Sequence, residues 1–327
     1  MRNSLPERLT CPRSPAGHCA TRSCAILQYH RVALLSHDPL RLAVQPHHFE
    51  RQMEYLATTC NVISLNELRQ HLETATPWRD RTVAVTFDGG YSDVLYTAQE
   101  VLERFEIPAT VFVPSVNLIG RTRFWWDVLE DVLIAGDSCG PLVVETEGES
   151  YCWSLASQHD RFRAFDDLYG ILSNQAPARQ RELITEILQS LDSPGEELDS
   201  HATLTAQELQ RLEEGGRITV GGYTHHGVKL SLLSEPEQRR EIQYNKRILE
   251  EVLGHGIECF AYPFGDEGSY TTATGRILRD SGFRLSCRVS PETVSVTGAD
   301  GLYELPRLTI RDWNPFTFHR YLNTFLG

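Results

Sequence analysis

The chain has 327 residues, of which 41% are hydrophobic and 23% are charged, a composition typical of ordinary globular proteins. Its formal net charge of −13 argues against a nucleic-acid backbone or an anionic membrane as partner. No apolar run reaches the roughly 18 residues of a membrane span. We therefore expect a neutral or cationic small-molecule substrate, and the sequence does not indicate an oligomeric state.

Residues 1–24 are rich in Arg, Pro, Ser and Gly and lack the apolar stretch of a secretory signal. We interpret them as a flexible N-terminal tail and expect a cytoplasmic protein with free thiols at its eight cysteines. The rest of the chain, 25–327, is long enough for one barrel-sized domain.

The first half of that domain alternates strands with helices. Apolar runs predict strands at 25–30, 81–87 and 109–113, and periodic segments predict helices at 49–58, 65–73 and 93–105. This spacing predicts parallel βαβ units. Asp88 stands where the second strand stops and a Gly-rich turn begins, and such strand ends carry the chemistry of α/β barrels.

Residues 117–202 break this alternation. They open with Phe-Trp-Trp-Asp at 124–127 and read as a helical insertion that caps one end of the barrel. The alternation then resumes, with strands predicted at 218–221, 259–262, 285–289 and 305–310 and helices at 205–213, 236–253, 271–281 and 316–325.

Five short blocks occur in an order that resembles the polysaccharide deacetylase family, also called the NodB-homology or carbohydrate esterase 4 family. They are Gln-Tyr-His-Arg-Val (28–32), Thr-Phe-Asp-Gly-Gly-Tyr (86–91), Ile-Thr-Val-Gly-Gly-Tyr-Thr-His-His-Gly-Val-Lys-Leu-Ser (218–231), Phe-Ala-Tyr-Pro-Phe-Gly (260–265) and Leu-Pro-Arg (305–307). The resemblance implies an α/β fold, a distorted (β/α) barrel of the NodB type with a helical insertion.

The same resemblance implies a site in which the first Asp of an Asp-Asp pair is the catalytic base. The second Asp and two histidines of that family bind a divalent metal, usually zinc. Here Asp88 matches the base, whereas Gly89, Tyr223 and Gly227 stand at the three ligand positions. Glycine offers no side-chain donor and a neutral phenol is a poor zinc ligand. We therefore expect no metal and no other cofactor at this site.

Several polar residues remain as candidates for catalysis without metal. Asp88 would act as general base, and Arg307 would hold it ionised. Tyr223 could donate to an oxyanion, or fill the lost metal site as packing. His225 or His226 could be an acid or a substrate contact, but adjacent residues of an extended segment point to opposite faces, so at most one would face the pocket.

The candidates for substrate binding are His30, Asp93, Trp125, Tyr262 and Pro263. Asp93 could equally cap the following helix, and Trp125 could belong to the core.

Two functions stay open. The first is a metal-independent hydrolase of a C–N (amide) bond in a sugar-derived or small amide substrate. The second is a catalytically inactive protein of deacetylase fold that binds a carbohydrate or a protein partner.

Overall fold

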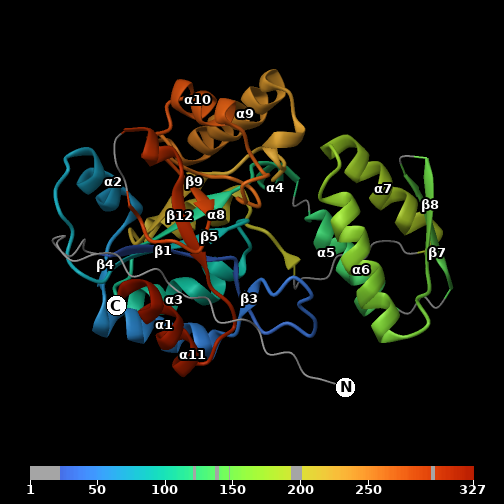
Figure 1. Cartoon of the computed structure of the whole chain (residues 1–327), viewed down its shortest axis with the longest axis horizontal. Coiled ribbons are helices and arrows are strands. Elements are labelled where there is room, and N and C mark those ends of the chain that lie inside the picture. The colour runs from blue at the N-terminus through green and yellow to red at the C-terminus, as the bar shows by residue number, and fades with distance from the viewer. Residues whose placement is uncertain (1–22, 121–122, 137–139, 147, 193–200, 296–298) are drawn as a thin grey trace, which may run out of the picture.

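The computed structural model describes residues 23–120, 123–136, 140–146, 148–192, 201–295 and 299–327. Its centre is a closed barrel of parallel strands in the order β1-β12-β11-β10-β9-β6-β5, with β5 pairing back to β1 (Figure 1). The strands are β1 (Cys24–Tyr29), β5 (Thr82–Asp88), β6 (Ala109–Val113), β9 (Ile218–Gly222), β10 (Cys259–Ala261), β11 (Leu285–Val289) and β12 (Leu305–Thr309). The predicted α/β barrel is confirmed, and a short strand β4 (Asn61–Val62) joins the start of β5.

Helices surround this barrel, close to the ranges that the sequence predicts. They are α1 (Pro46–Thr59), α2 (Leu65–Glu73), α3 (Gln99–Arg104), α8 (Ala206–Glu214), α9 (Glu235–Leu253), α10 (Thr272–Asp280) and α11 (Pro315–Leu326). The helix predicted at 93–105 begins instead with a π-helical turn, Val94–Ala98. A two-stranded sheet of β2 (Arg31–Val32) and β3 (Ala43–Val44) has no counterpart in the predictions.

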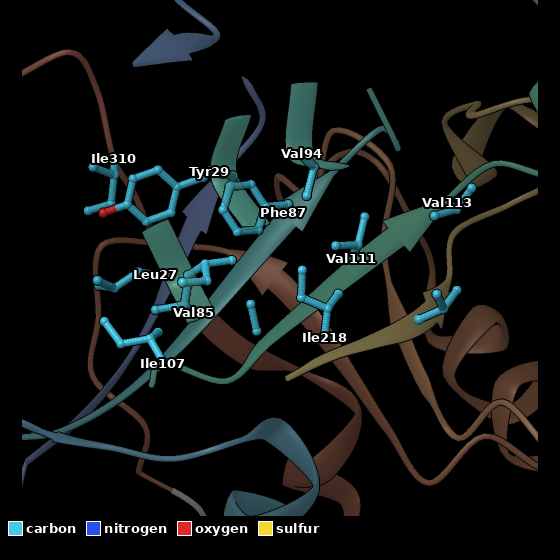
Figure 2. Packing of buried hydrophobic residues seen from close by; sticks show 14 of the residues in the cluster. Leu27, Tyr29, Val85, Phe87, Val94, Ile107, Val111, Val113, Ile218 and Ile310 are labelled. Atoms are coloured by element: carbon cyan, nitrogen blue, oxygen red, sulfur yellow. The ribbon is translucent and has the colours of Figure 1, made fainter. Parts of the chain in front are cut away.

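Each barrel strand has two faces because successive side chains point to opposite sides. The outer side chains pack beneath the helices in the main hydrophobic core, where Leu27, Tyr29, Val85, Phe87 and Val111 lie together (Figure 2). The alternate residues form a second cluster inside the barrel, with Cys24, Ile26, Ala84, Phe112 and Leu305 among its members. At the carboxyl ends of the strands this inward set becomes polar, with Gln28, Asp88 and Arg307.

The segment between β6 and β9 adds a helical group beside the barrel. It contains α4 (Val116–Gly120), α5 (Trp125–Glu130), a π-helical turn (Asp131–Ala135), the hairpin β7 (Leu142–Thr146) and β8 (Glu149–Trp153), α6 (Gln158–Leu172) and α7 (Pro177–Ser190). Its side chains form their own hydrophobic cluster, and α6, α7 and the hairpin stand to one side in Figure 1. The beginning of α5, by contrast, reaches the barrel mouth.

Three further expectations concern single segments. The predicted tail falls on residues 1–22, outside the described residues, and Cys24 already belongs to β1. The cysteines in the described ranges are free thiols, and Cys24, Cys259 and Cys287 are buried. Within those same ranges, none of the helices is both long and apolar enough to cross a bilayer.

One glycine allows an aromatic ring to fill the barrel interior. Gly221 on β9 is the register partner of Phe112 on β6. A Cβ atom built on Gly221 would lie 2.5 Å from the Phe112 ring, which is closer than real Cβ contacts come. The ring in turn lies under the Arg307 guanidinium, 5.3 Å from its centroid. The absence of a side chain at Gly221 therefore leaves room for the Phe112 ring, which supports the polar end of the barrel.

We predict that Gly221→Ala destabilises the protein by roughly 1–3 kcal/mol, because the ring must leave its rotamer or the strands must move apart. Gly170→Ala is the matched control, since Gly170 is exposed in α6 and its Cβ would meet nothing within 4 Å. The control should be neutral or stabilising by up to about 1 kcal/mol. Urea unfolding of both variants checks the prediction, and equal stabilities would contradict it.

Candidate active site at the barrel mouth

A buried ion pair lies at the carboxyl ends of β5 and β12. The guanidinium of Arg307 binds the Asp88 carboxylate through two parallel hydrogen bonds, Nη1 to Oδ1 at 2.6 Å and Nη2 to Oδ2 at 2.7 Å. The side-chain amide of Gln28 donates to Asp88 Oδ2 at 2.8 Å. Gln28 in turn accepts from the Thr309 hydroxyl at 2.8 Å. Two charged and two neutral side chains thus form one hydrogen-bonded network across β5, β1 and β12, where the barrel closes.

This network is closed to solvent. Asp88 is 1% exposed and Arg307 is fully buried. A carboxylate has about four acceptor positions, and Arg307 and Gln28 already use three of them. Asp88 therefore keeps one acceptor position, and a neighbouring side chain must move before water reaches it.

Above the ion pair is a small aromatic cavity, here called the mouth hollow, with a volume of about 60 Å³. Its walls are His30, Leu40, Leu42, Gly89, Tyr91, Phe124, Trp126, Tyr169, Tyr223 and Phe264. Phe124 and Trp126 stack with centroids 4.4 Å apart, and the Trp126 indole donates to the Tyr91 hydroxyl at 3.0 Å. This volume suits a few water molecules or a small acyl group.

The charges of Asp88 and Arg307 act on two polar side chains of this wall, His30 and Tyr223. Burial lowers the pKa of His30 to about 4, although the Asp88 charge acts in the opposite direction. Burial and the Asp88 charge both raise the pKa of Tyr223 well above its usual range. At neutral pH the hollow therefore presents a neutral imidazole, which can accept a proton, and a protonated phenol, which can donate a hydrogen bond.

The residues at the family's three metal-ligand positions do not fit a metal. Gly89 and Gly227 both have positive φ angles, +96° and +70°, and their Cβ positions lie 3.6 and 3.5 Å from the same ring, that of Phe124. A Cβ on Gly227 would also lie 3.8 Å from the Tyr223 ring. Side chains at the three positions would therefore converge, but the ring of Phe124, the residue before α5, lies against both glycines.

The paired histidines of the altered loop turn away from Asp88. His225 Nδ1 contacts the Ser115 hydroxyl at 2.9 Å, and its ring packs edge-on against Tyr244. His226 Nδ1 contacts Glu241 Oε1 at 2.7 Å, while its backbone N–H donates to Oε2 of the same carboxylate. The His226 ring lines a different cavity of about 350 Å³ between α5 and α7. Neither histidine lines the mouth hollow.

Four predicted substrate contacts also lie elsewhere. Tyr262 is turned to the outside of the barrel, where its hydroxyl donates to the Tyr303 carbonyl, and Pro263 follows it as a buried residue. Trp125 packs on Tyr169 on the insertion side, so Trp126 is the tryptophan of the hollow. Asp93 binds Arg31 at 2.9 Å and the Val32 N–H, and it forms no side-chain cap on the helix.

Sequence reasoning missed several members of this site, among them Gln28, Phe124, Trp126 as a wall distinct from Trp125, and Phe264. Strand alternation carries a signal for Gln28, since it lies two residues before His30 and must share its face. Phe264 has φ of +63°, a rare conformation for a side chain of this size, and no local pattern marks it.

The comparisons with known proteins agree with this geometry. A family model described as polysaccharide deacetylase matches residues 165–286, which include Tyr223 and Gly227 but neither Asp88 nor Arg307. No curated protein matches the sequence. The match and the fold together confirm the resemblance to the polysaccharide deacetylase family.

Solved deacetylase structures cover nearly the whole chain. A Streptococcus pyogenes deacetylase, PplD, in complex with acetate, superposes with a TM-score of 0.62 at 17% identity over 94% of this chain and 100% of its own. IcaB from Ammonifex degensii gives 0.59 at 19% identity over 94% and 98%. A de-N-acetylase from Aggregatibacter actinomycetemcomitans gives 0.58 at 11% identity over 91% and 99%. At these identities the likeness establishes the fold.

We predict that Arg307→Ala destabilises the protein by about 3–5 kcal/mol, because it leaves Asp88 as an uncompensated buried charge. The double variant Asp88→Asn with Arg307→Met removes both charges and should recover much of this loss. Denaturant unfolding of both variants beside the wild type measures the difference. A double variant no more stable than the single one would contradict the assigned cause.

We also predict an acid-sensitive contribution from His30. Between pH 6.5 and about 4 its imidazole binds a proton in the unfolded chain but not in the folded one. The wild type should therefore lose roughly 2–3 kcal/mol of stability across this window relative to His30→Gln, and no more below it. Urea unfolding at several pH values tests this, with His159→Gln, an exposed site in α6, as control. Parallel profiles for wild type and His30→Gln would refute it.

Proposed function

We propose that the protein is a deacetylase-type hydrolase that cleaves a C–N amide bond in a sugar-derived or small amide substrate without the family's metal. The observation that carries this proposal is the buried Asp88–Arg307 pair, bound by Gln28, whose charges act on His30 and Tyr223 in the wall of the mouth hollow. Its position at the carboxyl ends of barrel strands is where this architecture performs chemistry.

Stability alone does not explain this pair. Burying two charges carries a large desolvation cost, and well-packed apolar residues of similar volume are often as stable or more so. The Nε of Arg307 adds to the cost, because it finds no acceptor among the described residues. A charged pair retained under these conditions favours a chemical role for the carboxylate.

The groups of the mouth hollow supply the parts of an amide hydrolysis. Water in the hollow gives its proton to the base while its oxygen attacks the carbonyl carbon. Neutral His30, whose ring reaches the wall, takes the proton from water and passes it toward Asp88. Asp88 provides the negative charge of this base. The Tyr223 hydroxyl donates to the developing oxyanion. The proton then moves to the leaving nitrogen as the C–N bond breaks, and a carboxylic acid and an amine result.

The relatives support the class of substrate. PplD is described as a deacetylase in complex with acetate, and an acetyl-sized group matches the volume of the mouth hollow. The sugar or amine portion would remain outside, against Leu40, Leu42 and Phe264. The acyl group would enter between His30 and Tyr223.

A second candidate is a catalytically inactive protein that binds a carbohydrate. Two observations favour it: Phe124 lies between the former metal-ligand positions, and Asp88 has little remaining acceptor capacity. In that case the aromatic walls would bind the apolar face of a sugar, and no bond would be cleaved.

We predict amide hydrolysis that excess chelator does not abolish. The assay measures release of acetate and free amine from N-acetylated sugars and small acetamides by the purified full chain. Asp88→Asn and His30→Gln should each lower kcat/KM about 100-fold or more, because each removes part of the base. Asp280→Asn, an exposed carboxylate of α10, is the matched control and should leave the rate unchanged.

Three outcomes would count against the proposal. A rate that depends on added metal would refute the metal-free mechanism. A rate unaffected by both site variants, with their folding verified by circular dichroism, would refute the assigned base. No product from any substrate, together with carbohydrate binding measured by calorimetry, would establish the second candidate.

A further inference from the structure

A second group of metal-ligating side chains is buried outside the mouth hollow. Asp127 and Glu130 lie one turn apart on α5, and His201 precedes α8. One oxygen from each carboxylate and one ring nitrogen all lie within 4.8 Å of one another. The three residues are 3%, 8% and 4% exposed. None of them occupies a position of the family's metal site.

The charges around this group do not balance. The nearest arginines have carboxylate partners of their own, because Arg31 pairs with Asp93 and Arg123 with Asp131. The carboxylates of Asp127 and Glu130 then add two further negative charges.

Glu130 is the independent sign that a ligand belongs here. Asp127 accepts hydrogen bonds from the Tyr91 hydroxyl at 3.1 and 3.2 Å. The Glu130 carboxylate forms neither a hydrogen bond nor an ion pair within the described ranges, although the charges of Arg31 and Arg123 act on it. A carboxylate more than nine-tenths buried without a partner is costly unless a cation compensates it.

His201 is suitable as the third ligand. Its Nδ1 lies 3.4 Å from Asp127 Oδ1, so one ion can contact both atoms. Arg31 Nη1 competes for this nitrogen at 2.9 Å. Arg31 also binds Asp93 through Nε, so a cation at His201 would replace the Nη1 contact and leave the Nε contact in place.

We propose that Asp127, Glu130 and His201 hold one divalent transition-metal cation of the Zn²⁺ type. Two carboxylates neutralise its charge, and the mixed oxygen and nitrogen donor set suits zinc, with water completing the coordination. The ion would fasten the start of α5, which carries Phe124 and Trp126, to the segment before α8. Its role is structural, and no step of the hydrolysis proposed above passes through it.

The test uses the full chain, freed of metal by chelation and titrated with Zn²⁺. Calorimetry should give one site that depends on this cluster, and saturation at about 100 times Kd should raise Tm by roughly 5 °C. Glu130→Gln and His201→Gln should each weaken binding at least tenfold. Glu182→Gln, an exposed carboxylate of α7, is the matched control and should bind as the wild type does.

Co²⁺ in place of Zn²⁺ distinguishes this cluster from the cysteines of the chain. Thiolate ligands give intense near-ultraviolet absorption, whereas an oxygen and nitrogen set does not. Absence of stoichiometric binding in the wild type would overturn the proposal, as would a thiolate spectrum or binding that both variants leave unchanged. Circular dichroism of the metal-free variants checks that a loss of metal binding does not result from unfolding.

Discussion

The hydrogen-bonded pair of Asp88 and Arg307 is the constraint on which the barrel mouth depends. The two residues come from β5 and β12, and both strands pair with β1, so the pair spans the strand at which the barrel closes. Gln28 of β1 lies between them and binds the same carboxylate. Because a buried charge tolerates little displacement, this contact fixes the relative positions of three strands and of His30 at the end of one of them.

The insertion completes the mouth that the barrel begins. Phe124 and Trp126 extend from α5 over the end of β5, and the Tyr91 hydroxyl links the indole to the Asp127 carboxylate. Trp126 of the hollow and the buried carboxylates of Asp127 and Glu130 therefore lie within one short helix, α5, where Trp126 and Glu130 are four residues apart and share a face. A change that shifts this helix alters the hollow and the cluster of Asp127, Glu130 and His201 together.

The sequence predicts most of the fold and the centre of the site, and the reasons are physical. Apolar runs locate the barrel strands, and the family resemblance supplies Asp88 and Arg307 as partners, which the structure joins in one ion pair. Alternation also carries information that the predictions did not use, since Tyr262 follows the inward Ala261 and must point outward. His226 is different, because its partner Glu241 is on α9, fifteen positions away, and no local pattern reveals that contact.

Gly89 and Gly227 limit how a metal centre could be introduced at the barrel mouth. Their backbones adopt left-handed angles that disfavour other side chains, and a Cβ on either would lie within 3.6 Å of the Phe124 ring. A metal-ligating side chain at one of these positions would be strained and would face Phe124 without yet creating a site. Engineering a metal centre here would therefore require simultaneous changes at Gly89, Gly227 and Phe124.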